Sequence, residues 1–348
     1  MRSAVLVEPG QFAIEKRERP TPDADEVLVA VDTVGICGSD IHYYTHGRIG
    51  EYVVEDPLVL GHESAGEVVA VGTDVEHVAR GDRVAIEPGV PCGDCEYCRG
   101  GVYNLCLDVR FMATPPVDGA FAEYVAWPES FVYPLPDGVS TRAGALCEPL
   151  SVALHACRRG EIGPGDTVHV AGFGPIGALV MEVARLRGVA DVFVSDVVPA
   201  KLARASERGA DATIDVRDRD VAEAVRDHVE GGADVSIEAS GAPSSIAAAP
   251  SVVRRGGTVV LVGLAPDDAV PLDTNEVVDE ELDLRGSFRF RHTYGTAVDA
   301  LTDGAVDVEG IIDFEAPLED VDDAFRRVRE DESVIKGTIS LRNTDSHI

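Results

Sequence analysis

Basic residues are scarce in this sequence. The 348 residues include 62 aspartates and glutamates against 30 lysines and arginines, a formal net charge of −32, and the only lysines are Lys16, Lys201 and Lys336. Such a negative surface repels nucleic acid and anionic lipid, so both are poor partners. The charge is typical of a soluble acidic enzyme. More specifically, it favours a halophilic protein from a salt-loaded cytoplasm, where molar cations screen the dense carboxylates.

Long apolar runs and a secretory leader are also lacking. No apolar stretch approaches the ~20 residues of a membrane span, and the start, MRSAVLVEPGQFAIEK, has no basic region followed by a long apolar one. The seven cysteines are odd in number and mostly in metal-type spacing, which fits a reducing compartment. We therefore expect a cytoplasmic protein. Its length suits two domains of roughly 150 residues each.

Four cysteines are crowded into the segment PCGDCEYCRGGVYNLC, at positions 92, 95, 98 and 106. The spacing C-x2-C-x2-C-x7-C is too tight for unstrained disulfides. Four thiolates instead suit one tetrahedral Zn²⁺ and close its coordination sphere completely. A closed sphere leaves no position for a substrate. This cluster is therefore expected to be structural, and a metal that takes part in chemistry has to be bound elsewhere.

The chain changes its hydrophobic pattern near residues 150 and 287. Before the first boundary, LVAVDTVG, SAGEVVAVG and DRVAIEPG alternate apolar and polar residues as half-buried strands do. From about 164, buried strands alternate with amphipathic helices, a pattern typical of a parallel, doubly wound α/β sheet. The last helix of this series is expected over 244–257. Beyond 287 we expect two surface helices and a closing strand, KGTISL.

The segment GFGPIG has the glycine spacing of a dinucleotide-binding turn, between an expected strand and an expected helix. Gly172 permits the tight turn, Gly174 lets the backbone approach a pyrophosphate, and Gly177 lets the helix pack on the strand. Asp196 ends the next expected strand. A carboxylate there accepts hydrogen bonds from an adenosine ribose and repels a 2′-phosphate, which indicates NAD rather than NADP.

Residues suited to a catalytic zinc occur in the expected β-rich region and just after it. A catalytic zinc needs about three protein ligands and one open position. Each candidate alone has an ordinary explanation, since Cys37 suits a core thiol and His62-Glu63 a helix cap. Together, beside a dinucleotide site, they favour a metal centre. The candidates are Cys37, Ser39, Asp40 and His42 in GICGSDIHYYTHGRIG, His62 and Glu63 in VLGHESAGEV, and Glu148 in ALCEPLSVALHAC.

These segments, with ATPPVDGAFAEY and EPLSVALHACRR, carry a resemblance over essentially the full length. The sequence resembles the zinc-dependent medium-chain dehydrogenases, and looks closest to their sorbitol (L-iditol 2-) and xylitol dehydrogenase branch. The resemblance implies a GroES-like β-rich catalytic domain over 1–150, to which 287–348 returns, and a Rossmann domain over 151–286. It also implies a homotetramer that oxidises a secondary hydroxyl of a polyol to a ketose, with hydride transfer to NAD.

The same resemblance implies one catalytic and one structural zinc per subunit. Cys37, His62 and Glu63 would hold the catalytic ion with a water, and Glu148 would touch that water or ligate transiently. Cys147 leaves an alternative open, because other members of the wider family bind zinc by a cysteine from this segment. The structural ion would be held by Cys92, Cys95, Cys98 and Cys106.

Further roles follow from the resemblance. Asp40 would accept a hydrogen bond from His62 and so fix its tautomer. Ser39 and His42 would relay the proton to solvent, although His42 also suits a plain surface residue and Glu148 offers another proton route.

Substrate and coenzyme contacts are implied in the same way. Tyr43, Glu148, Arg289 and Phe290 would line the polyol pocket, and Phe290 stands where sorbitol enzymes usually have a tyrosine, so one hydroxyl donor is missing. The residues implied to contact the coenzyme are Gly172, Gly174, Ile176, Gly177, Asp196, Lys201, Val262, Gly263, Leu264, Ser287, Phe288 and Arg289.

Rival functions remain open at the level of sequence. L-Threonine dehydrogenases share the expected fold, both zinc sites and the cofactor, but the GRIG, ATPPVDG and FR segments fit them poorly. A 2,3-butanediol-type zinc dehydrogenase is a further alternative. A protein of another class, a zinc knuckle that binds nucleic acid, conflicts with the net charge. A non-catalytic member of the family conflicts with the presence of Cys37, His62 and Glu63.

Overall fold

The computed structural model describes residues 1–265 and 269–341, and the chain divides into two compact units. Unit 1 comprises Met1–Glu148, Tyr294–Gly304 and Val308–Ile348, and unit 2 comprises Pro149–Thr293 and Ala305–Asp307. Within the described residues, helices long and apolar enough to cross a bilayer are absent.

Unit 2 is built on a parallel sheet. In spatial order its strands are β15 (Ala212–Asp215), β14 (Asp191–Asp196), β13 (Thr167–Ala171), β16 (Ala233–Glu238), β17 (Val253–Leu261) and β18 (Asp283–Gly286). Every neighbouring pair is parallel, and the order reverses between β13 and β16. Strand β13 is buried throughout because helices pack on both faces of such a sheet. The predicted doubly wound fold is confirmed.

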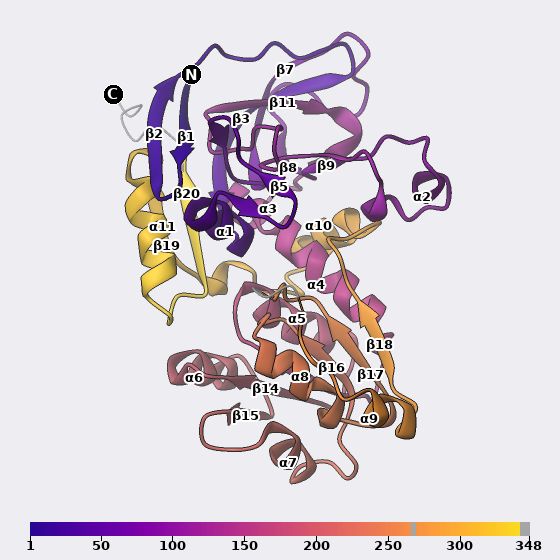
Figure 1. Ribbon diagram of the computed structural model, residues 1–348. Helices are drawn as coiled ribbons and strands as arrows, with labels where there is room; N and C mark the ends of the chain where they lie inside the picture. The colour runs from indigo at the N-terminus through magenta and orange to yellow at the C-terminus, as the bar shows by residue number, and fades with distance from the viewer. Residues whose placement is uncertain (266–268, 342–348) are drawn as a thin grey trace. The chain divides into compact units, whose positions relative to one another are not determined.

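The helices of unit 2 follow its strands in the sequence and are visible in Figure 1. They are α5 (Pro175–Leu186), α6 (Pro199–Glu207), α7 (Val221–Arg226), α8 (Pro243–Val252) and α9 (Thr274–Asp279). Helix α5 starts with Pro175, whose fixed φ and missing N–H suit a first helical position. The helix predicted over 244–257 is too long, because α8 ends at Val252 and β17 begins at Val253.

Unit 1 is rich in antiparallel strands. Its largest sheet has the order β12 (Val132–Pro134), β8 (Arg83–Ile86), β7 (Glu63–Val71), β3 (Glu26–Gly35), β20 (Lys336–Ser340) and β19 (Ile312–Pro317), and β11 (Tyr124–Pro128) also pairs with β3. A smaller sheet has the order β2 (Gln11–Lys16), β1 (Arg2–Glu8) and β6 (Leu58–Val59). The pairs β4 (Arg48–Ile49) with β5 (Tyr52–Val53), and β9 (Gly89–Val90) with β10 (Arg110–Phe111), are short ribbons. The strands predicted from alternation correspond to β3, β7 and β8.

Unit 1 also contains helices. They are α1 (Gly38–His46), α2 (Glu96–Arg99), α3 (Thr141–Ala145), α10 (Tyr294–Thr302) and α11 (Val321–Glu330), while α4 (Cys147–Arg159) begins in unit 1 and continues into unit 2. In Figure 1 the segment that carries α2 projects from the rest of unit 1 as a separate lobe. Strand β20, from the far end of the chain, pairs antiparallel with β3 and parallel with β19. This pairing brings the last described strand next to the first candidate ligands.

Candidate metal centres and dinucleotide site

Cys37, His62 and Glu63 come together in unit 1. Cys37 is the N-cap of α1, and Glu63 is the first residue of β7, opposite Gly35 of β3 in the antiparallel register. One ligand atom from each of the three side chains lies within 4.8 Å of the others. A thiol, an imidazole and a carboxylate are the donor types that a zinc with an open position uses. These residues therefore fit a catalytic zinc.

Asp40 fixes the geometry of this cluster. Its side chain is fully buried, and its two oxygens accept hydrogen bonds from the backbone N–H groups of Cys37 (3.0 Å) and Gly61 (3.1 Å). The same carboxylate lies 3.5 Å from His62 Nδ1. Burial lowers the pKa of His62, but Asp40 and Cys37 raise it more, so the net shift is well upward. Negative charge therefore accumulates around this imidazole, as a cation site requires.

Lys336 is a fully buried cation beside the cluster, and the sequence analysis gave it no role. Its Nζ donates hydrogen bonds to Glu63 Oε1 (2.6 Å) and to the backbone oxygen of Ile36 (2.9 Å), and lies 2.5 Å from Glu63 Oε2. Burial lowers the pKa of Lys336, whereas Glu63 and Cys37 raise it, and the net shift is upward. The one signal in the sequence was a rare lysine at the start of an apolar strand, VIKGTISL.

The second carboxylate oxygen of Glu63 contacts the Lys336 ammonium as an ion pair at 2.5 Å. Among the described residues, Glu63 Oε2 is buried without a hydrogen bond of good geometry. Space for this carboxylate is left by Gly35, since a Cβ there would lie 2.0 Å from Glu63 Oε2. The Lys336 ammonium offsets the cost of burying this oxygen. The fit of the cluster to zinc is supported by its donor set, a carboxylate held in place beside a thiol and an imidazole.

Glu148 and Cys147 begin α4 and are both buried. The pKa of Glu148 is raised to about 7, chiefly by burial; Glu63 and Asp40 contribute to this rise, and His62 and Lys336 oppose it. Glu148 therefore shares the electrostatic environment of the cluster and can hold or release a proton near neutral pH. Burial also raises the pKa of Cys147 strongly, which keeps it a thiol. Both Cys147 and Glu148 lie outside the group of potential ligands found among the described residues, which consists of Cys37, His62 and Glu63.

Ser39, His42 and Tyr43 lie on α1, directly after Cys37. Ser39 is half-buried, His42 is exposed and Tyr43 is buried. Helix α1 ends at Gly47, whose φ of 66° lets its N–H bond to the Tyr43 carbonyl oxygen. The structure thus places the candidate relay residues on the helix that begins at a candidate ligand.

The four-cysteine lobe gathers its sulfurs in the same unit. The Sγ atoms of Cys92, Cys95, Cys98 and Cys106 lie within 4.8 Å of one another, and all are free thiols. Cys98 Sγ is 3.4 Å from Cys95 Sγ and 4.0 Å from Cys92 Sγ. Sulfurs about 2.3 Å from a central zinc lie roughly 3.8 Å apart, so these separations suit one tetrahedral ion.

Backbone N–H groups point at the sulfurs of the lobe. The N–H groups of Cys92, Cys95 and Cys98 donate to Sγ atoms of the group at 3.3–3.5 Å. The hydrogen bond from Cys98 N–H contributes most to lowering the pKa of Cys95 to about 6. Burial and the neighbouring sulfurs instead raise the pKa of Cys98 to about 12. A thiolate is the ligand form that zinc binds, so Cys95 is the sulfur of the lobe that is prepared for a metal.

A buried carboxylate anchors the lobe to the sheet of unit 1. Glu87 accepts hydrogen bonds from Tyr103 Oη (3.0 Å), in the lobe, and from Tyr133 Oη (2.9 Å), in β12. Tyr133 packs against Tyr294, whose hydroxyl donates to the Ile86 backbone oxygen at 2.6 Å. No motif in the sequence predicts a role for these residues. Hydrogen-bonded tyrosines around a buried acid hold the lobe in a defined position.

The glycine turn of unit 2 has the geometry of a phosphate-binding turn. Gly172 has a φ of 90°, which a residue with a Cβ rarely adopts. A Cβ at Gly177 would lie 1.9 Å from the Gly172 oxygen, so only glycine lets α5 approach β13 this closely. Gly174 is the N-cap of α5, Ile176 is half-buried in its first turn, and the free N–H groups of that turn suit an anion.

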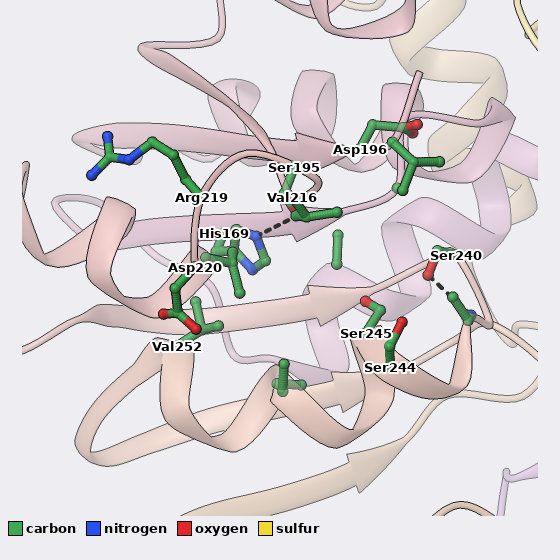
Figure 2. Close-up of a pocket in the computed structure, with 17 residues that line it drawn as sticks. His169, Ser195, Asp196, Val216, Arg219, Asp220, Ser240, Ser244, Ser245 and Val252 are labelled. Atoms are coloured by element: carbon green, nitrogen blue, oxygen red, sulfur yellow. Dashed lines mark hydrogen bonds between the residues drawn. The ribbon is translucent and has the colours of Figure 1, made fainter. Parts of the chain in front are cut away.

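Asp196 ends β14 beside this turn. Its carboxylate accepts hydrogen bonds from the backbone N–H groups of Phe173 (2.7 Å) and Val198 (2.9 Å), which fixes its orientation. Lys201 lies half-buried in the first turn of α6, the helix that follows β14. A pocket of about 240 Å³ opens next to Asp196 and is lined by residues of several strands and helices (Figure 2). Such a carboxylate at the edge of a pocket suits recognition of a ribose hydroxyl.

The remaining candidate coenzyme residues follow β17 and β18. Val262 and Gly263 donate backbone hydrogen bonds to the Glu238 oxygen, and Ser287 N–H bonds to the Leu261 oxygen. Leu264 and Phe288 are exposed. Because β17 and β18 are parallel neighbours, these residues reach the same edge of the sheet as the glycine turn.

Two features of the segment after β18 bear on ligand binding. Ser287 Oγ is buried without a hydrogen-bond partner among the described residues. Arg289 has a φ of 49°, and its guanidinium stacks on the Phe288 ring at 4.8 Å. An unsatisfied buried hydroxyl and a strained backbone are typical of a ligand-binding segment. Phe290 is buried in the same unit.

Two family models match separate parts of the chain. Residues 23–137 match the family described as "Alcohol dehydrogenase GroES-like domain", and residues 175–303 match "Zinc-binding dehydrogenase". Sorbitol dehydrogenase of Bacillus subtilis (strain 168) is 43% identical over 328 residues, covering 94% of this chain and 93% of that protein.

Solved structures agree with the sequence relatives. L-Idonate 5-dehydrogenase of Escherichia coli superposes with a TM-score of 0.90 at 34% identity, covering 97% of each chain. A Sinorhizobium meliloti protein titled as a zinc-binding dehydrogenase, solved with bound NADP, has a TM-score of 0.90 at 32% identity and covers 97% of this chain and 98% of that one. With a zinc-type donor cluster in one unit and a dinucleotide turn in the other, this chain belongs to the zinc-binding dehydrogenases with a GroES-like domain, and it is an oxidoreductase that uses zinc and a nicotinamide coenzyme.

Proposed function

We propose that the protein oxidises a secondary hydroxyl of a sorbitol- or xylitol-like polyol to a ketose and transfers the hydride to NAD. The observation that carries this proposal is the cluster of half-buried Cys37 with buried His62 and Glu63, in a chain that is 43% identical to a sorbitol dehydrogenase. We assign the catalytic domain to unit 1 and the coenzyme-binding Rossmann domain to unit 2.

Two zinc ions complete the proposed enzyme. Cys37, His62 and Glu63 would hold the catalytic ion with Glu148 nearby, and the four cysteines of the lobe would hold a structural one. A zinc at the first site supplies Lewis acidity, which favours loss of a proton from a bound alcohol. The four-sulfur site has no free position and serves folding.

The side chains of unit 1 position the reaction and handle the proton. Lys336 orients the Glu63 carboxylate, and Asp40 fixes the ring of His62. Glu148 can hold or release a proton near pH 7, because burial raises its pKa to about 7. Ser39 and His42 offer a second route, since His42 is exposed and passes a proton directly to solvent.

Coenzyme and substrate residues complete the assignment. The fixed carboxylate of Asp196 would accept hydrogen bonds from the adenosine ribose and repel a 2′-phosphate, which favours NAD over NADP. Ser287, Phe288 and Arg289, with Val262 to Leu264, would contact the nicotinamide end. Tyr43, Arg289 and Phe290 would line the polyol pocket with Glu148.

The charge and the resemblance extend the proposal to the whole molecule. We assign the protein to the cytoplasm of a halophile, since 62 acidic residues against 30 basic ones suit a salt-loaded solvent. A homotetramer is proposed from the resemblance to polyol dehydrogenases.

A substrate panel tests the function. Sorbitol, xylitol, L-idonate, 2,3-butanediol and L-threonine would be assayed at high salt with NAD and NADP, and zinc would be measured on the same sample. We expect kcat/KM to be highest for a polyol with NAD, and two zinc ions per chain. The Cys37→Ser variant should lose NADH production and one zinc, whereas Cys157→Ser, outside both clusters, should keep both ions. Activity on L-threonine alone would refute the polyol assignment.

A further inference from the structure

Two histidines form an exposed pair on α1. His42 and His46 are one helical turn apart, both side chains are exposed, and their ring centroids are 5.9 Å apart. Residues at i and i+4 point to the same side of a helix. His46 is the last residue of α1, because Gly47 caps the helix. The pair therefore presents two imidazoles to solvent at a rigid position.

The separation of the rings suits a shared metal ion. An ion bound at about 2.0–2.1 Å by one nitrogen of each imidazole places the two ring centroids roughly 4.5–5.5 Å apart. Histidines at i and i+4 on one helix are a general way to bind zinc-like ions. The observed 5.9 Å requires only small rotations of the exposed side chains.

The surroundings of the two imidazoles favour the binding of a metal ion over the binding of a proton. Partial burial lowers the pKa of His42, and the neighbouring His46 lowers it further. A metal binds the neutral imidazole, so a lowered pKa leaves the lone pair available at neutral pH. The net charge of −32 also raises the local concentration of cations.

We propose that His42 and His46 form a third, reversible metal site on α1, which takes a divalent transition-metal ion of the zinc, nickel or copper class. The pair is separate from the two clusters described above, neither of which contains a residue of this pair. Two imidazoles leave the other coordination positions to water, so binding is weaker than at either cluster. The consequence for catalysis depends on the proposed function: an ion on His42 occupies the ring nitrogen that would pass the proton to solvent, and so slows turnover.

Nickel binding to the zinc-loaded protein tests the site itself. Ni²⁺ would be titrated by calorimetry into the wild type, His46→Gln and His77→Gln, and the histidine ring signals would be followed by NMR, since Ni²⁺ broadens nearby protons. His77 is a matched control because it is exposed in a loop and has no histidine one turn away. We expect a saturable event in the wild type that broadens the signals of both His42 and His46. It should weaken about tenfold or more in His46→Gln and stay unchanged in His77→Gln. Equal affinity in all three proteins would overturn the proposal.

Turnover tests the consequence separately. NADH production would be followed at increasing Ni²⁺ within minutes of mixing, with zinc content checked afterwards. Reversible inhibition that EDTA relieves, and that His46→Gln escapes while retaining its activity without nickel, supports the inhibitory role. Binding in the wild type without any change in its turnover would overturn that role. Absence of turnover on every polyol without nickel would refute the proposed function, and the binding result would stand on its own.

Discussion

At the scale of single residues, the candidate catalytic cluster requires a glycine at position 35, where a side chain would collide with Glu63. Gly35 faces Glu63 across the β3–β7 pairing, and a Cβ there would lie 2.0 Å from Glu63 Oε2. We expect Gly35→Ala to displace this carboxylate, to lower zinc content by one ion per chain and to reduce kcat/KM by about 100-fold or more. Gly38→Ala is the control, because a Cβ at Gly38 meets no atom within 4 Å. Full zinc content and activity in Gly35→Ala would contradict this reading.

Lys336 provides a second test at this scale. Replacing it by methionine removes the cation from the buried Glu63 and leaves that charge unpaired. In chelator-treated protein, we expect Lys336→Met to lower the free energy of unfolding by about 3 kcal/mol or more, as measured by denaturant titration. Lys16→Met, at an exposed lysine, should change it by about 0.5 kcal/mol or less. Zinc should recover part of the loss, because a cation beside Glu63 replaces the missing charge.

The sequence identified the ligand types but not the residue that balances them. Short sequence motifs contain Cys37, His62 and Glu63, and their residue types predict metal ligands without a structure. Lys336 lies 273 positions after Glu63, and only the pairing of β20 with β3 brings the two together. Glu87 was missed for the same reason, since its partner Tyr133 belongs to the paired strand β12 and not to a neighbouring motif.

At the scale of secondary-structure elements, a buried histidine in the centre of the parallel sheet contacts serine hydroxyls on both neighbouring strands. His169 of β13 lies between Ser195 of β14 and Ser236 of β16, with 2.9 Å from a ring nitrogen to each hydroxyl oxygen. The contact with Ser195 is drawn in Figure 2. Burial lowers the pKa of His169 to about 4. The ring is therefore neutral in the folded protein at every pH above this value.

The buried His169 predicts that the folded protein loses stability at acidic pH. The unfolded chain binds a proton at His169 below about pH 6.5, whereas the folded protein does so only near pH 4, so acid favours unfolding. The stability that depends on a neutral His169 is fully present above pH 6.5 and is lost as the pH falls towards 4. We expect the free energy of unfolding to decrease by about 3 kcal/mol from this cause. Unfolding free energies of wild type and His169→Gln between pH 7.5 and 4.5 check this, and parallel curves for the two proteins would refute it.

Element types were more predictable than their ends. Strong alternation and the glycine turn predicted β3, β7, β13 and α5, because local pattern decides those elements. The helix predicted over 244–257 was too long, since Val253 pairs with Ala233 in the sheet and this long-range pairing outweighs helical continuity. The short elements α9 and β18 were not predicted, since neither carries a long enough hydrophobic pattern.

At the scale of the whole molecule, charge is the dominant feature. A formal charge of −32 on 348 residues opposes compaction unless cations screen it. We expect the melting temperature to fall by several degrees or more when KCl is lowered from molar to about 0.1 M. Sucrose in place of KCl separates screening from general solute exclusion, since sucrose carries no charge. A melting temperature that is independent of KCl would contradict a halophilic origin.

The placement of Lys336 also has a consequence for synthesis. A ribosome delivers Cys37, His62 and Glu63 nearly 300 residues before the strand that inserts beside β3 and completes their surroundings. Until that strand is made, the nascent chain contains Cys37, His62 and Glu63 without the Lys336 ammonium that pairs with Glu63. Unit 1 therefore cannot complete the surroundings of these residues until β20 has been synthesised and has paired with β3.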